Sequence, residues 1–121
     1  MKIYTSYFGN LKNIPPNIFP VAICARSPSW FTGLNVKFLA PSYEILSKYK
    51  LNGNTSEYTQ AYIHEILNFL YVPDVVHYLN VKSGGKDVVL LCYETPDKFC
   101  HRHLVADWLN CNGYQCKEYG T

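Results

Sequence analysis

The chain has 121 residues, 48% of them hydrophobic, which predicts one folded domain with its own core and excludes intrinsic disorder. Eleven Lys and Arg against nine Asp and Glu give a net charge of +2, too small to indicate a nucleic-acid or membrane surface by itself. No apolar run reaches the roughly 18 residues of a membrane span, and the N-terminus lacks a signal-peptide core, so we expect a cytoplasmic protein.

Two residue types are used in an informative way. Five Cys is an odd number, and we expect reduced thiols, most of them small buried hydrophobic residues. Only two Arg occur, Arg26 and Arg102. The imbalance with Lys fits an AT-rich coding bias. It also fits a chain that keeps Arg where bidentate recognition of phosphate or carboxylate is needed.

The first third of the chain predicts two strands. Lys2–Tyr7 is rich in β-branched and aromatic residues, and Val21–Ala25 is a continuous apolar run of strand length. Between them, Leu11–Pro20 contains three Pro and predicts an irregular connection. Arg26 follows the second strand directly.

Ser27–Gly33 is a predicted loop with two adjacent large aromatic residues, Trp30 and Phe31. In one interpretation the rings plug the end of the core, since aromatic side chains bury large areas. In the other they form a lid or stacking platform beside Arg26, which would suit a planar base.

The middle of the chain predicts helices. Ser42 can cap a helix over Tyr43–Tyr49, and Thr55 or Ser56 can cap a longer one over Glu57–Leu70. Spacing directs an apolar stripe of the longer helix inward, comprising Tyr58, Tyr62, Ile66, Phe69 and Leu70. A third helix is predicted over Asp74–Val81.

The last third predicts a strand at Asp87–Tyr93, a helix from about Lys98 to Asn110 and a short strand at Tyr114–Tyr119. The order of elements predicts a single α/β domain with a mostly parallel sheet flanked by helices. Such sheets bind ligands outside the carboxyl ends of their strands. Several polar residues fall at these ends: Ser6, Tyr7, Arg26, Cys92, Glu94, Cys100, His101 and Arg102.

Cys100, His101 and Arg102 would occupy the first turn of their helix, where free backbone N–H groups favour an anion. A thiol beside His and Arg is a candidate nucleophile or redox group. Glu94 and His101 are candidates for proton transfer.

Each of these residues also has a structural interpretation. Cys92 fits a buried strand, Cys100 could pack beneath the helix start, and Glu94 could pair with either Arg. A zinc site is disfavoured because no C-x-x-C pair is present, and Cys92 is not followed by the Arg of a phosphatase-type loop. We therefore expect no metal and no cofactor.

A strand ending Leu-Leu-Cys-x-Glu, a Pro-containing loop and Cys-His-Arg at a helix start resemble the bacterial family "domain of unknown function 488". The segments KIYTSYFGN and AICARSPSW resemble two further strands of that family. The resemblance implies a Rossmann-like fold and conservation at Arg26, Cys92, Glu94, Cys100, His101 and Arg102. It also implies action on nucleotides or nucleic acids, without specifying a reaction.

We accordingly expect a phosphate-bearing ligand, nucleotide-like or nucleic acid, at the strand ends. Arg26 and Arg102 would hold the anion with help from Ser6, Tyr7 and Cys92. Glu94, Cys100 and His101 are the candidate catalytic residues of a hydrolytic or base-modifying reaction.

Two alternatives stay open. One is a non-catalytic interaction protein that uses the Trp30–Phe31 loop as its contact surface. The other is a thiol redox protein in which Cys92 and Cys100 approach closely enough to bridge.

Overall fold

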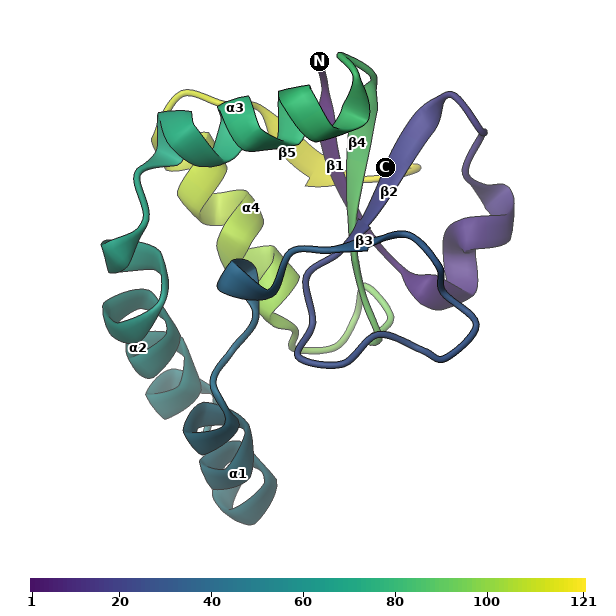
Figure 1. The fold of residues 1–121 in the computed structure, drawn as a ribbon. Helices are drawn as coiled ribbons and strands as arrows, with labels where there is room; N and C mark the ends of the chain where they lie inside the picture. Colours follow the sequence, from purple (N-terminus) through teal and green to yellow (C-terminus); the bar gives the residue numbers. More distant parts are fainter.

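Five parallel strands form the centre of the computed structural model, which describes residues 1–121 (Figure 1). In chain order the strands are β1 (Ile3–Tyr7), β2 (Ile18–Ala22), β3 (Leu34–Asn35), β4 (Asp87–Cys92) and β5 (Cys116–Glu118). Their order in the sheet is β3-β2-β4-β1-β5. The α/β class is thereby confirmed, and every pair of neighbouring strands is parallel.

Four α-helices and three 3₁₀ helices connect the strands. They are η1 (Phe8–Asn13), η2 (Lys37–Leu39), α1 (Tyr43–Asn52), α2 (Thr55–Glu65), η3 (Leu67–Phe69), α3 (Val72–Ser83) and α4 (His101–Cys111). No helix has the length and apolar character needed to cross a membrane.

The two faces of the sheet are covered differently. Alternate residues of β4, such as Val88 and Leu90, point to the larger core, which contains buried side chains from all four α-helices. The intervening residues, Val89 and Leu91, point to a smaller core that no α-helix reaches. There η1 and Phe31 cover the sheet, so the four α-helices pack on one face only.

A helical hairpin of α1 and α2 extends past the end of the sheet (Figure 1). The Ser42 hydroxyl caps α1 by accepting a hydrogen bond from the Ile45 amide at 3.2 Å. Gly53, with φ of 60°, ends that helix, and Asn54 starts the next by accepting from the Glu57 amide at 3.0 Å. This tight turn lets α2 pack against α1.

The structure corrects several boundaries. Asn54, rather than Thr55 or Ser56, caps α2, and this helix ends at Glu65 rather than at Leu70. Because the chain leaves the helical path at Ile66, the expected inward stripe is broken and Phe69 is 83% exposed. The second strand starts before the expected Val21, and its Pro20 is tolerated because β3 pairs with only the last two residues of β2.

Candidate functional site

A cleft of about 570 Å³ opens at the carboxyl ends of β2 and β4. One wall is the chain after these strands together with the start of α4, and the other is the inner side of the α1–α2 hairpin. Its volume lies within the range of small-molecule sites. Five of the expected site residues line it: Arg26, Cys92, Glu94, Cys100 and His101.

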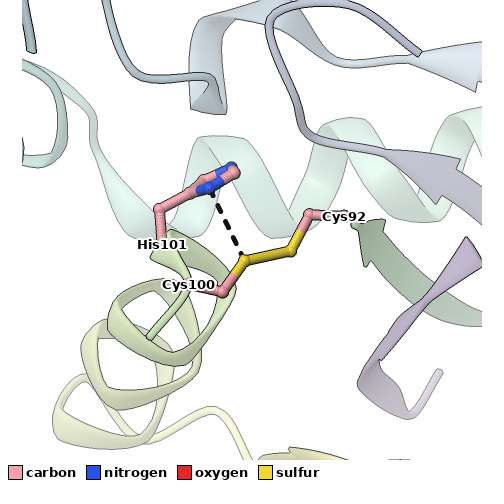
Figure 2. A group of neighbouring side chains, drawn as sticks. All are labelled: Cys92, Cys100 and His101. Atoms are coloured by element: carbon pink, nitrogen blue, oxygen red, sulfur yellow. Dashed lines mark hydrogen bonds between the residues drawn. A yellow bond between two sulfur atoms is a disulfide. The ribbon is translucent and has the colours of Figure 1, made fainter. Parts of the chain in front are cut away.

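Cys92 and Cys100 are joined by a disulfide at the inner end of the cleft (Figure 2). This corrects the expectation of reduced thiols for these two residues, whereas Cys24, Cys111 and Cys116 are free. The pair forms because the loop after β4 returns to place the start of α4 beside the strand end. The sulfur atoms meet although the two Cα atoms are 7.6 Å apart, slightly beyond the separation expected for a bridging pair.

His101 is buried beside this pair. Its Nε2 lies 2.6 Å from the Ile23 carbonyl oxygen, and its Nδ1 lies 3.9 Å from Cys100 Sγ (Figure 2). A carbonyl oxygen only accepts, so Nε2 carries the proton and Nδ1 presents its lone pair to the sulfur. Burial lowers the pKa of His101 to about 4 despite the hydrogen bond to Ile23. The ring is therefore neutral at pH 7.

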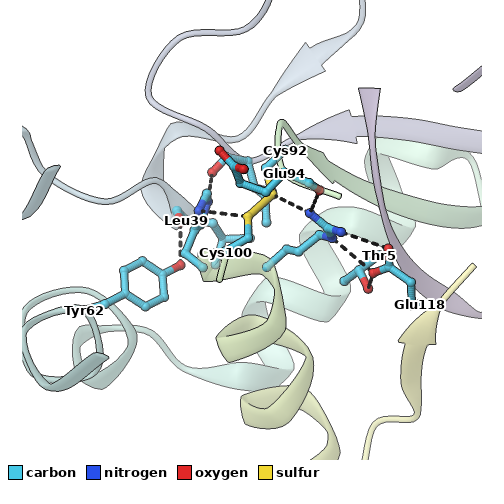
Figure 3. Close-up of a disulfide and its surroundings, with 10 residues drawn as sticks. Thr5, Leu39, Tyr62, Cys92, Glu94, Cys100 and Glu118 are labelled. Atoms are coloured by element: carbon cyan, nitrogen blue, oxygen red, sulfur yellow. Dashed lines mark hydrogen bonds and ion pairs between the residues drawn. A yellow bond between two sulfur atoms is a disulfide. The ribbon is translucent and has the colours of Figure 1, made fainter. Parts of the chain in front are cut away.

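Arg102 has no exposed surface and points away from the cleft. Its guanidinium donates to both carboxylate oxygens of Glu118, at 3.1 and 2.9 Å (Figure 3). Nη1 donates to the Glu94 carbonyl oxygen at 2.6 Å and to Cys92 Sγ at 3.2 Å. Every guanidinium nitrogen is thus engaged within the chain, and Arg102 ties α4 to β5 and to the end of β4.

Arg26 and Glu94 are exposed at the mouth of the cleft. The only ion pair in the chain joins Arg102 to Glu118, so neither Arg26 nor the Glu94 carboxylate is paired. The expected structural role of Glu94 as partner of an arginine side chain therefore does not occur. Tyr93 fixes the Arg26 segment, because its hydroxyl donates to the Arg26 carbonyl oxygen at 2.5 Å.

Aromatic rings line the cleft from both sides, because Tyr49 and Tyr58 belong to the α1–α2 hairpin and Phe99 to the chain before α4. Tyr49, Tyr58 and Phe99 border the cleft, and each pair of these rings has centroids between 4.9 and 5.5 Å apart. Tyr62 continues the cluster inward to the His101 ring. The rings thus form a firm apolar surface beside two polar residues, Arg26 and Glu94.

Four other sequence-derived residues lie outside the cleft. Ser6 is buried, and its hydroxyl accepts a hydrogen bond from the side-chain Nδ2 of Asn10 at 3.1 Å. The Tyr7 ring faces the Arg102 guanidinium at 5.9 Å. Trp30 is 59% exposed, whereas Phe31 packs on Phe8 in the smaller core. The loop therefore plugs the core with one ring and exposes the other.

Several residues of the site were missed by sequence reasoning. Lys50 and Tyr49 reach the cleft from α1, and Glu118 holds Arg102 from a strand of three residues. The four-residue spacing of Leu46 and Lys50 was a signal that α1 turns one face to a common surface. Nothing in the local sequence around Glu118 indicates its partner.

Comparison with known proteins identifies the family. The model of DUF488-N3a, described as the active DUF488-N3 subclade, matches residues 24–113. No curated protein and no solved structure matches the chain. The matched range begins just after β2 and includes every residue that lines the cleft. The chain therefore belongs to the DUF488 family, within the DUF488-N3a subclade.

Proposed function

We propose that the cleft binds a phosphate-bearing, nucleotide-like ligand and that the protein acts on this ligand as an enzyme. The observation that carries the proposal is the position of Arg26, an unpaired guanidinium at the mouth of a cleft with an aromatic wall. A guanidinium fork suits a phosphate, and stacked rings suit a planar base.

The electrostatics of the cleft support an anionic ligand. Arg26 approaches from the end of β2 and Lys50 from α1, so two cations flank the opening against one carboxylate, Glu94. The start of α4 adds backbone N–H groups at the inner end. A Rossmann-like mode of binding, with the ligand outside the carboxyl ends of parallel strands, agrees with this arrangement.

The case for an enzyme rests on reactive groups in the same cleft. Glu94 has no ion-pair partner and can transfer protons, and reduction of the Cys92–Cys100 disulfide would give a Cys100 thiol beside the lone pair of His101 Nδ1. The matched family model is described as an active subclade. A hydrolytic or base-modifying reaction on the bound ligand is the activity we propose, and we place it in the cytoplasm.

Calorimetric titration with nucleoside monophosphates and diphosphates tests the proposal. We expect Arg26→Ala to weaken binding about 10- to 100-fold, the value of a hydrogen bond to a charged group, with the melting temperature unchanged. Lys50→Ala should also weaken binding, because Lys50 is the second cation at the cleft. Lys48→Ala is its matched control, because Lys48 lies on the same helix but does not line the cleft. Equal affinity in the wild type and Arg26→Ala would refute the proposal.

A second candidate function, thiol redox chemistry, is favoured by the Cys92–Cys100 disulfide at the inner end of the cleft. The test measures the fraction of the chain that holds the disulfide, rather than two thiols, in buffers of defined redox potential. Full oxidation across the whole reducing range would identify a structural bond and remove this candidate.

The third candidate, a contact surface at the aromatic loop, has the exposure of Trp30 in its favour. Phe31 is committed to the smaller core, so a single ring is available. We rank this function below the cleft because one exposed ring is common on protein surfaces.

A further inference from the structure

We propose that Cys92, Cys100 and His101 form a binding site for a zinc-class divalent metal ion, with one coordination position open to the cleft. The two Sγ atoms and one ring nitrogen all lie within 4.8 Å of one another. All three residues are buried, with exposed fractions of 1, 6 and 6%. This site goes beyond the proposed function and does not depend on it.

The set of donors selects the class of metal. Two thiolates and one imidazole are the ligands that zinc prefers over magnesium or calcium, which take oxygen ligands. Three protein ligands leave one tetrahedral position free, as in catalytic rather than structural zinc sites. Since all three ligands line the cleft, we infer that this position faces the ligand.

The imidazole is already oriented for coordination. Its Nε2–H donates to the Ile23 carbonyl oxygen at 2.6 Å, which leaves Nδ1 unprotonated toward the sulfurs (Figure 2). Metal-bound imidazoles in proteins are commonly fixed in this way by a carbonyl or carboxylate on the other nitrogen. The residue that supplies the carbonyl directly follows β2, so the sheet itself holds the ring.

The cysteine backbones fit two ligands of one ion. Their Cα atoms are 7.6 Å apart, whereas most disulfides have Cα separations of about 4.4–6.8 Å. Zn–S bonds of about 2.3 Å in a tetrahedron place the sulfurs about 3.8 Å apart. Rotation of the two side chains within the same backbone provides that spacing. Arg102 Nη1, 3.2 Å from Cys92 Sγ, would stabilise a thiolate there.

The disulfide and the metal site are two states of the same residues. A dithiol reductant gives the Cys92–Cys100 bond two electrons and two protons, and it is itself oxidised to a disulfide. The metal ion then replaces the two thiol protons, which pass to solvent. The spacing C-x7-C-H hides the site in the sequence, and the loop after β4 brings the three residues together.

The test uses the whole chain reduced with a phosphine, which takes oxygen from water as the disulfide opens to two thiols. Cobalt(II) is titrated as an optical probe, and zinc is then measured by X-ray absorption. We expect one ion per chain, a thiolate-to-cobalt charge-transfer band, and a first shell with two sulfur atoms. Opening of the disulfide should be required, so the oxidised chain should bind no cobalt at this site.

Variants assign the ligands. Cys92→Ser and Cys100→Ser should each weaken cobalt binding by more than about 100-fold. Loss of a residue that only hydrogen-bonds to a metal ligand costs about 10- to 100-fold, and loss of a ligand should cost more. Cys24→Ser is the matched control, because this thiol lines the same cleft without belonging to the cluster, and it should bind as the wild type does.

Metal binding by the wild-type chain tests the proposal even where a variant fails to fold. A reduced, folded wild type that binds no cobalt, or that holds zinc through oxygen and nitrogen alone, would overturn the proposal. Cobalt binding by the oxidised chain with the same spectrum would also overturn it. Nucleotide binding by Arg26 variants is measured separately, so the two proposals can fail independently.

Discussion

The guanidinium of Arg102 and the carboxylate of Glu118 face each other in a two-pronged ion pair, with N–O distances of 3.1 and 2.9 Å. The arginine side chain has no exposed surface and that of the glutamate is 13% exposed. Thr5 supports the pair by donating to Glu118 Oε1 at 2.8 Å. The pair therefore joins α4 to β5, and Thr5 links it to β1 (Figure 3).

Breaking this pair should destabilise the fold. We expect Arg102→Met to lower the free energy of unfolding by about 3 kcal/mol or more, because the Glu118 carboxylate loses its partner at a largely buried position. Urea denaturation gives the value. Arg26→Met is the matched control, since Arg26 is exposed and unpaired, and should change stability by less than about 0.5 kcal/mol. Equal effects of the two substitutions would contradict a structural role for Arg102.

The partner of Arg102 could not be predicted from the sequence. The placement of Arg102 in the first turn of a helix is confirmed, although α4 starts at His101 rather than at about Lys98 and Cys100 is its N-cap. A first-turn Arg suits an anion site. The anion that Arg102 meets is a carboxylate of the same chain, 16 residues away on a strand too short to be periodic. Local pattern predicts where a strand or helix lies, but it contains no information on which long-range partner a charge will find.

Tyr62 should contribute to stability through its hydroxyl. This group donates to the Leu39 carbonyl oxygen in a buried contact that joins α2 to η2. Tyr62→Phe leaves that acceptor unsatisfied, and we expect a loss of about 1–3 kcal/mol in the free energy of unfolding. Tyr43→Phe, at a position that is 84% exposed, is the control and should be neutral. A neutral Tyr62→Phe would mean that water replaces the lost donor.

The free cysteines should differ sharply in reactivity. Cys111 is exposed, whereas burial, with a smaller contribution from the Glu118 carboxylate, raises the pKa of the Cys116 thiol to about 12. A raised pKa leaves little thiolate at pH 8, so Cys111 should be alkylated at least about 100-fold faster. Mass spectrometry after native labelling with iodoacetamide measures both rates. In Cys111→Ser the fast phase should vanish, and a fast phase that persists would place another thiol at the surface.

One wall of the cleft, at the strand ends, could be predicted from the sequence, and the other could not. Arg26, Glu94 and Cys100 follow strand runs that the apolar pattern identifies, and the carboxyl ends of parallel strands share one edge. The opposite wall comes from the α1–α2 hairpin, whose position depends on a turn at Gly53 and on packing between rings far apart in the chain. Tyr49 and Lys50 therefore could not be assigned to the site before the fold was known.

Tyr93 should position Arg26 without touching the ligand phosphate. Its hydroxyl holds the Arg26 carbonyl oxygen, while its ring stays packed on Phe8 with centroids 5.1 Å apart. Tyr93→Phe keeps the ring contact and frees the backbone that carries the guanidinium. Reordering that segment costs about 1 kcal/mol, so nucleotide binding should weaken about fivefold.

The same variant separates positioning from stability. Because Tyr93 is exposed at the cleft, the melting temperature should stay within about 1–2 °C of the wild type while the dissociation constant rises. Tyr119→Phe is the control, since Tyr119 packs edge-on against Tyr4, does not line the cleft, and should bind nucleotides as the wild type does. Wild-type affinity in Tyr93→Phe would show that the end of β2 alone holds the Arg26 segment. A large fall in melting temperature would instead show that the hydroxyl contributes to stability rather than to binding.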